Sequence, residues 1–184
     1  MIFGKRVRLR AIERDDIPRF IKWFNDPDVR EHLALYRPLS LAQEEKWFEA
    51  LAERESTDHL FAIETCEGVH IGNLGLHGIN WKDRSAELGI AIGEKDHWGQ
   101  GYGTDAITTL LGYAFDELNL HRVFLRVNAD NPRGIGCYEK CGFVHEGTLR
   151  HAVFTAGQYK DQHMMSILQT EYAQPDDDDA KQRR

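Results

Sequence analysis

Hydrophobic residues recur along this chain at two different spacings, and each spacing predicts a different kind of element. Repeats of three and four residues, as at Ile17, Phe20, Ile21 and Phe24, predict amphipathic helices, whereas strict alternation predicts half-buried strands. In chain order the pattern predicts a strand over 6–10, helices over 15–26 and 40–51, strands over 59–65, 69–79 and 85–93, a helix over 106–118, a strand over 121–128, a helix over 131–138, and strands over 143–154 and 162–169.

Residue types at the ends of these segments support the boundaries. We expect Asp15 to cap the first helix and Pro18 to lie in its first turn, where a missing amide costs nothing. Ser40 and Gln43 have the spacing of a capping box ahead of the second helix. Gly142 is expected to end the last helix in a left-handed conformation.

This order of elements predicts an α/β (α+β) fold: a mixed, largely antiparallel central sheet flanked by helices on both faces. Residues 59–93 read as an antiparallel meander, with a turn at Glu67 and Gly68. We expect a single domain over residues 1–172, because two domains in 184 residues would each have a small core. The acidic and basic residues 173–184 are expected to form a disordered tail.

Composition narrows the range of partners. With a formal net charge of −7, the chain lacks the basic surface that binds nucleic acid through phosphate contacts. No apolar run is long enough to span a membrane, and no signal sequence is readable, so we expect a soluble cytoplasmic protein. The three cysteines form no CxxC pair and the nine histidines form no HExxH motif, so we expect no disulfide framework and no metal site.

A cluster of glycines stands out in the stretch HWGQGYGT, residues 97–104. A phosphate-binding GxxxxGK loop is excluded because the lysine is missing. Gly101, Gly103 and Ala106 match the GxGxxA part of a dinucleotide fingerprint, but a meander precedes them instead of a parallel strand. Two alternatives remain: an anion site made by free backbone amides at a helix N-terminus, or a turn that uses glycine for conformation alone.

Several segments together resemble the GCN5-related N-acetyltransferase (GNAT) superfamily, in particular the branch of RimJ/RimL-type and spermidine N-acetyltransferases. The resemblance spans Lys5 to Tyr172 and rests on WFNDPDVREHL, AELGIAI, HWGQGYGTDA, LNLHRVFLRVNADNPRGIGCYEKCGF and GQYKDQHMMSIL. The superfamily loop often begins with Gln or Arg where Trp98 stands, although an aromatic residue there is familiar in this branch. The chain departs from the branch at Gly134 and Gly136, where alanine and a longer residue are common. Each glycine costs a helix interior roughly 1 kcal/mol relative to alanine.

The resemblance implies acetyl-CoA as the cosubstrate. It implies that the backbone amides of the glycine loop bind the pyrophosphate and that one strand binds the pantetheine arm through its backbone, where the sheet splays open. Asn131 is implied as a partner of that arm from the other wall. The cofactor-binding residues implied in this way are Ile90, Ala91, Ile92, Trp98, Gly99, Gln100, Gly101, Tyr102, Gly103, Thr104 and Asn131.

The resemblance also implies direct transfer of the acetyl group to an amine. Tyr138 matches the family tyrosine that gives a proton to the departing thiolate, a role that suits a phenol because it stays protonated at neutral pH. Glu87 is the candidate base for the amine, although a carboxylate on an alternating strand is equally expected simply to face solvent. Cys137 and Cys141 are interpreted as packing residues.

The acceptor site is expected around residues 25–36 and 159–161. Asp26, Asp28, Glu31 and Tyr36 are the substrate-binding candidates there, because carboxylates favour a cation. A polyamine such as spermidine or a protein N-terminal amine fits this interpretation. The alternatives are an acetyl-CoA-binding sensor or assembly module without turnover and an acetyltransferase of an aminoglycoside-like antibiotic. A homo-oligomer is expected from the resemblance.

Overall fold

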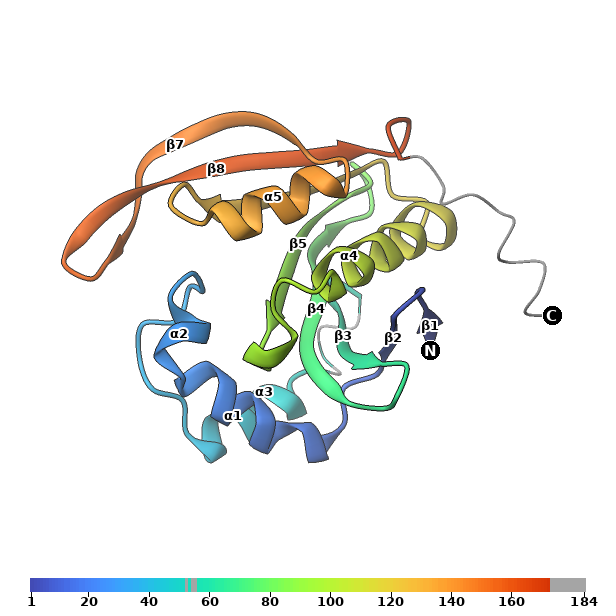
Figure 1. Ribbon diagram of the computed structural model, residues 1–184. Helices are drawn as coiled ribbons and strands as arrows, with labels where there is room; N and C mark the ends of the chain where they lie inside the picture. The colour runs from blue at the N-terminus through green and yellow to red at the C-terminus, as the bar shows by residue number, and fades with distance from the viewer. Residues whose placement is uncertain (52, 54–55, 173–184) are drawn as a thin grey trace.

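The computed structural model describes residues 1–51, 53 and 56–172 of the chain (Figure 1). One eight-stranded sheet runs through it, in the spatial order β1-β2-β3-β4-β5-β6-β8-β7. The strands are β1 (Ile2–Phe3), β2 (Val7–Arg10), β3 (His59–Thr65), β4 (His70–Asn80), β5 (Ser85–Ile92), β6 (Arg122–Asn128), β7 (Val144–Thr155) and β8 (Gln158–Leu168). The sequence pattern predicted all of them except β1, which is too short to show a period.

The pairing of β5 with β6 determines where the sheet opens. All other neighbouring strands are antiparallel, which confirms the predicted meander from β3 to β5, but β5 and β6 are parallel. Their pairing covers only residues 85–87 and 122–124. Beyond these residues β5 continues through Ile90, Ala91 and Ile92 without β6 beside it. The sheet is therefore forked, with one strand edge of β5 facing the gap.

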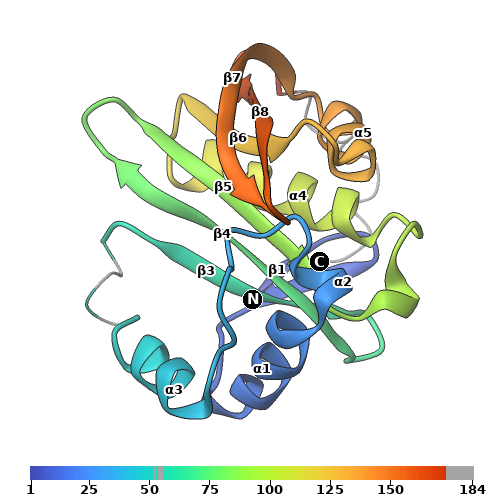
Figure 2. The same cartoon turned by 90° about the vertical axis from the view of Figure 1, so that its left-hand side faces the viewer.

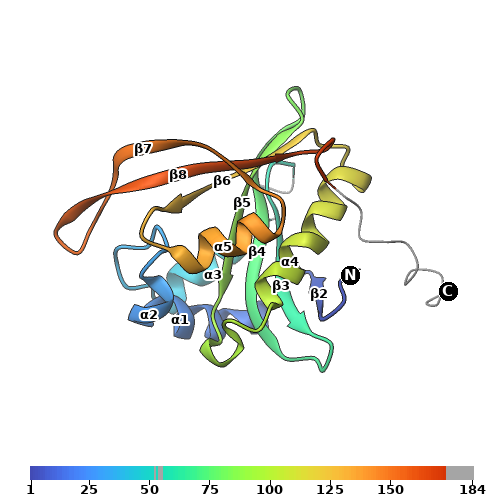
Figure 3. The ribbon, with the colours of Figure 1, turned by 45° about the horizontal axis from the view of Figure 1, so that its top comes forward.

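Helices cover both faces of the sheet, as the sequence predicted. Figure 2 shows α1 (Ile17–Asn25) and α3 (Leu41–Glu49) together on one face and α4 (Tyr102–Gly112) and α5 (Pro132–Lys140) on the other. Neighbouring residues of β3 show the division, since Ile63 packs in the core with α4 while Ala62 packs in a second core with Phe20 and Trp23. Figure 3 shows β7 and β8 running past α5 as a long hairpin.

Helix boundaries differ from the sequence-based predictions in three places. The prediction that Asp15 caps α1 is wrong, because a short 3-10 turn over Arg14–Asp16 comes first and buried Asp16 precedes the helix. A short helix, α2 (Pro27–Arg30), begins at Asp26, whose side chain accepts a hydrogen bond from the Asp28 amide. α4 starts at Tyr102, four residues before the predicted start at Ala106, because Gly101 caps the helix and Gly103 lies in its first turn.

Other predicted boundaries are confirmed. The capping box of Ser40 and Gln43 is present at the start of α3. Asn131 caps α5 by accepting a hydrogen bond from the Gly134 amide at 2.9 Å, and Gly142 ends that helix with a φ of +91°. Residues 173–184 lie outside the described residues, so the predicted tail has no structural counterpart here. Within the part of the chain that the structure describes, no helix is long and apolar enough to cross a membrane.

Candidate active site

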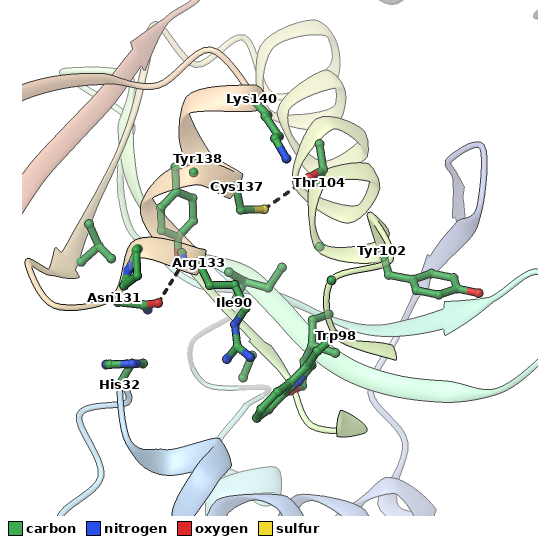
Figure 4. A pocket seen from close by; sticks show the side chains of 18 of the residues that line it. His32, Ile90, Trp98, Tyr102, Thr104, Asn131, Arg133, Cys137, Tyr138 and Lys140 are labelled. Carbon is green, nitrogen blue, oxygen red and sulfur yellow. Dashed lines mark hydrogen bonds between the residues drawn. The ribbon is translucent and has the colours of Figure 1, made fainter. Parts of the chain in front are cut away.

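A cavity of about 400 Å³ lies at the fork between β5 and β6. Its walls come from β5, from the glycine loop and first turn of α4, from the end of β6, and from α5 (Figure 4). The segment after α1 closes the remaining side with Val29, His32 and Leu33. The forked pairing of the sheet is what leaves room for it, because no strand fills the space beside the second half of β5.

The glycine loop forms one end of the cavity. Gly99 and Gly101 have φ values of +72° and +86°, a region that residues with a side chain rarely adopt, so these two glycines are required by the backbone. Gly101 is the N-cap of α4, and Tyr102, Gly103 and Thr104 form its first turn. The first amides of a helix have no partner within the helix and carry a partial positive charge. The loop is therefore suited to bind an anion at this end.

Contacts on both sides fix the loop in place. The indole nitrogen of Trp98 donates a hydrogen bond to the carbonyl oxygen of Ile92 at 2.7 Å. Across the cavity, the Arg133 guanidinium lies 3.9 Å from the centre of the Trp98 ring, so this pair joins the loop to α5. On the outer side, the Asp105 carboxylate accepts hydrogen bonds from backbone amides at the start of β2. These contacts hold the α4 N-terminus against β5.

The structure brings almost all of the predicted cofactor-binding residues together. Gln100 is the exception, since it lies outside the cavity lining and its side chain donates to the carbonyl of Asp96. Asn131 lines the wall opposite β5, although its side-chain oxygen already caps α5. The predicted residues that line the cavity are Ile90, Ala91, Ile92, Trp98, Gly99, Gly101, Tyr102, Gly103, Thr104 and Asn131.

Tyr138 lies on α5 in the middle of the cavity wall, between the glycine loop and the segment with His32 (Figure 4). Burial raises the pKa of its phenol well above the usual value, and the neighbouring Cys137 and Cys141 thiols add to this effect. The phenol therefore keeps its proton across the neutral range. Such a group can donate a proton to a leaving group in the cavity.

Two cysteines, Cys137 and Cys141, lie close to Tyr138 in the chain, and the sequence predicted that both are packing residues. Cys137 lines the cavity, and its sulfur lies 3.4 Å from the Thr104 hydroxyl oxygen. A hydrogen bond from the Cys141 thiol lowers the pKa of Cys137, and the Thr104 hydroxyl contributes in the same direction. Cys141 itself packs against the carbonyl of Thr104 and the hydroxyl of Thr108. Cys137 thus combines packing with ready ionisation beside the cavity.

Glu87 lies on β5 but outside the residues that line the cavity. Both of its carboxylate oxygens accept hydrogen bonds from Arg126, at 2.9 and 3.1 Å. Arg126 itself does line the cavity. The role of Glu87 as a base stays a prediction, and in this structure its carboxylate is engaged by a guanidinium.

None of the four predicted acceptor residues lines the cavity. Asp26 and Asp28 each form an ion pair with Lys95 at 2.8 Å, and Tyr36 is exposed. Glu31 lies beside His32, and it is His32 that lines the cavity, together with Val29 and Leu33. Sequence reasoning missed His32, Arg126 and Arg133, since none belongs to a spacing motif and only the fold brings them to one place.

A metal centre has no structural support. Among the described residues, no group of three or more His, Cys, Asp or Glu side chains is placed to hold a metal ion. The polar groups that line the cavity include backbone amides, a phenol, guanidinium groups and an ammonium group, which bind anions or donate protons, together with two imidazoles and one thiol.

Comparison with known proteins agrees with this geometry. A family model described as an acetyltransferase (GNAT) domain matches residues 6–144, about three quarters of the chain. The chain belongs to the GNAT family of acetyltransferases. Spermidine N(1)-acetyltransferase of Vibrio cholerae is 35% identical over 169 residues, which cover 92% of this chain and 96% of that protein. The enzyme of the same name from Escherichia coli is 31% identical over 175 residues, covering 90% of this chain and 88% of that one.

Solved structures extend the similarity to three dimensions. The structure of the Vibrio cholerae spermidine N-acetyltransferase in complex with CoA and spermine superposes with a TM-score of 0.83 at 34% identity. It covers 90% of this chain and 97% of the neighbour. This GNAT chain is therefore an N-acetyltransferase that uses acetyl-CoA, and the open strand edge and glycine loop fit that cosubstrate.

Proposed function

We propose that this GNAT chain transfers the acetyl group of acetyl-CoA to a primary amine of a polyamine such as spermidine. The observation that carries the proposal is one continuous cavity with anion-binding amides at one end, half-buried Tyr138 in its wall and a histidine-bearing, acid-flanked segment at the other end. The near full-length similarity to spermidine acetyltransferases of two bacteria supports the choice of a polyamine.

The cofactor end of the cavity would hold the charged diphosphate and the extended pantetheine arm of the cosubstrate. Amides from Gly99 to Thr104 supply donors for a diphosphate, and Lys140, which also lines the cavity, adds a positive charge. The edge of β5 at Ile90 and Ile92 offers backbone groups to the amides of an extended pantetheine arm. Acetyl-CoA supplies a thioester, whose carbonyl carbon is open to attack by an amine.

Tyr138 is proposed to donate a proton to the thiolate that leaves. Its raised pKa keeps the phenol protonated until negative charge develops beside it, and burial strengthens that interaction because water does not screen it. Arg133 and Trp98 would cover the cofactor arm between the two ends, since their stacked side chains lie on opposite walls of the same cavity.

Charge at the acceptor end supports a cationic substrate. Glu31 and Asp130 lie within 4 Å of the His32 ring nitrogens, at 3.9 and 3.8 Å. The net charge of −7 adds a weaker long-range attraction for a polycation. A polyamine carries several ammonium groups, so one can be deprotonated for reaction while the others stay near these carboxylates.

We further propose a cytoplasmic location and a homo-oligomeric state. The three cysteines are all free thiols, as is usual in a reducing compartment. Size-exclusion chromatography with light scattering tests the oligomer directly.

The test of the function is release of free thiol from acetyl-CoA with a panel of amines. The panel contains spermidine, spermine, peptides beginning with Ala or Ser, and an aminoglycoside, and mass spectrometry identifies the acetylated product. We expect spermidine and spermine to give the highest kcat/KM. A preference for the peptides or the aminoglycoside would contradict the proposal, and so would the absence of thiol release with every amine despite coenzyme A binding.

A further inference from the structure

Acetylation of an ammonium group requires a base, and the structure limits where that base can lie. The protonated amine must lose a proton before its nitrogen can attack a thioester. Glu87, the candidate from the sequence, lies outside the cavity lining, and Arg126 occupies both of its oxygens. As a base, Glu87 would have to reach the amine from outside the lining residues while Arg126 holds its carboxylate. A base that faces the cavity directly is the simpler solution.

Two histidines are present among the described residues that line the cavity. His97 belongs to the glycine-loop end, where its ring packs against Tyr102 with ring centres 5.3 Å apart. His32 lies at the opposite end, beyond Asn131 and away from Thr104 and Lys140 (Figure 4). It is therefore on the side from which an acceptor would approach Tyr138. Histidine changes its protonation near neutral pH, which suits a general base.

The Asp130 carboxylate lies next to the His32 ring. The Nδ1 atom of His32 is buried, makes no hydrogen bond with any described residue, and lies 3.8 Å from the Asp130 Oδ1 atom. This distance is longer than a hydrogen bond, so the carboxylate acts on the ring through its charge, and Glu31 lies at a similar 3.9 Å from Nε2. In the tautomer with its proton on Nδ1, the lone pair on Nε2 can accept a proton.

Asp130 is itself held in its charged form. A hydrogen bond from the Lys160 ammonium on β8 lowers the pKa of Asp130, so the carboxylate stays ionised at neutral pH. Lys160, Asp130 and His32 thus form a row of side chains from β8, the β6–α5 connection and the segment after α2. Side chains from three separate elements therefore meet at this part of the cavity wall.

We propose that His32 is the proton acceptor for the substrate amine, with the Asp130 carboxylate next to its ring. This inference rests on the proposed function. Nε2 of His32 takes one proton from the ammonium group, directly or through a water, and the neutral amine nitrogen then bonds to the acetyl carbon as the carbon–sulfur bond breaks. Tyr138 gives its proton to the sulfur, and the second proton that the nitrogen loses as the amide forms returns to the phenolate. His32 passes its proton to solvent, so each turnover yields the acetylamine, the free thiol and one proton.

Charged groups of both signs lie around the cavity near His32. The Asp130 and Glu31 carboxylates lie 3.8 and 3.9 Å from its ring nitrogens, and the Arg126 guanidinium lines the same cavity. Lys160 acts mainly through Asp130, whose charge it partly neutralises. The rate should therefore rise with pH as the imidazole loses its proton, and the position of this acid limb should depend on Asp130.

The experiment compares His32→Gln with wild type in the thiol-release assay with spermidine between pH 5.5 and 9. We expect kcat to fall by about 10²–10³-fold, the acid limb of kcat/KM attributed to His32 to disappear, and coenzyme A affinity to stay within twofold. His145→Gln, at an exposed histidine on β7, is the matched control and should keep the wild-type profile. Asp130→Asn should move the acid limb to lower pH, because the imidazolium loses a neighbouring negative charge.

A second variant separates chemistry from structure. Added imidazole should raise the rate of the His32→Ala variant at least tenfold. It would not do so if His32 had only a structural role. If His32→Gln kept the wild-type kcat and acid limb while wild type acetylated spermidine normally, the assignment of His32 would be overturned and the proposed function would stand. If wild type released no thiol with any polyamine, the proposed function itself would be overturned, and this assignment with it.

Discussion

Glu87 of β5 and Arg126 of β6 form a two-point ion pair across the fork of the sheet, with nitrogen–oxygen distances of 2.9 and 3.1 Å. Glu87 belongs to the last paired position of these strands, opposite Phe124, and Arg126 lies two residues further along β6, where the strands have separated. The pair therefore joins the two arms of the fork and holds a guanidinium at the cavity wall.

Replacing Glu87 with Gln tests what this pair does. Without the carboxylate, the Arg126 charge is uncompensated and repels a cationic acceptor, so we expect the spermidine KM to rise about three- to tenfold. The kcat should stay within about threefold, since the proton acceptor is elsewhere. A hundredfold loss of kcat at unchanged KM would instead identify Glu87 as the base. Steady-state kinetics with spermidine as the varied substrate distinguish the two outcomes, and the KM for acetyl-CoA is the internal control.

Replacing Tyr138 with Phe removes one oxygen atom from the middle of the cavity. We expect kcat to fall roughly 10²–10³-fold, because the thiolate would leave without a proton donor. Coenzyme A affinity, measured by calorimetry, should change less than twofold, since the ring and its packing against Phe143 remain. Equal activity of wild type and variant would remove Tyr138 from the reaction.

Alkylation of cysteine tests whether the cofactor occupies the wall with Cys137. The lowered pKa of Cys137 means that iodoacetamide should react readily at pH 7. Saturating coenzyme A should slow this reaction at least tenfold, because Cys137 lines the cavity beside Thr104. Exposed Cys66, which does not line the cavity, is the control and should react equally with and without coenzyme A. Peptide mass spectrometry measures alkylation of both cysteines in one sample. Equal rates of alkylation at Cys137 with and without coenzyme A would place the cofactor elsewhere.

Replacing Asp16 tests how much the buried polar cluster next to α1 contributes to the stability of the fold. The carboxylate accepts two hydrogen bonds from Arg10, at 2.8 and 2.9 Å, and lies 2.9 Å from the Nδ1 atom of buried His70. Burial alone raises the pKa of Asp16, but the hydrogen bonds from Arg10 and the Glu13 amide outweigh this effect, and the pKa is lowered. We expect Asp16→Asn to reduce the free energy of unfolding by about 3 kcal/mol at pH 7, because Arg10 loses a buried partner.

The pH dependence of this loss follows from the sign of the shift. A lowered folded-state pKa contributes stability that is complete above about pH 4, the usual value for an unfolded aspartate, and that disappears as the pH falls through the folded value. The difference between wild type and Asp16→Asn should therefore narrow below pH 4. Urea unfolding at pH 7 and pH 3 measures it. Asp15→Asn, at the exposed neighbour, is the control, and a constant difference at both pH values would contradict the assignment.

The strands and the cofactor end of the cavity could be predicted from the sequence because their signals are local. The alternating pattern gives β3 to β5, and glycines at 99 and 101 are needed wherever the backbone takes a positive φ. Resemblance to a known family supplied the roles of these residues. The structure adds detail at Gly134 that the sequence did not predict. An added Cβ at Gly134 would lie 2.7 Å from the Asn131 side chain that caps α5, whereas an added Cβ at Gly136 would meet open space.

The acceptor end could not be predicted in the same way, because its residues come from segments far apart in the chain. His32 follows a four-residue helix that has no periodic signal, and Asp130 lies in a connection about a hundred residues later. The acidic residues chosen from the sequence, Asp26 and Asp28, pair with Lys95 instead of facing the cavity. Only the packing of α2 against the β6–α5 connection reveals which side chains meet.

Calorimetric titration of coenzyme A tests the central claim that the amides at the start of α4 bind the diphosphate. We predict one site per chain, and at least a tenfold weaker affinity for Gly101→Ala, because an alanine at a φ of +86° strains the loop and moves its amides. Circular dichroism confirms that the variant is folded. Absence of binding by the wild-type protein, or equal affinity of wild type and folded Gly101→Ala, would contradict the account.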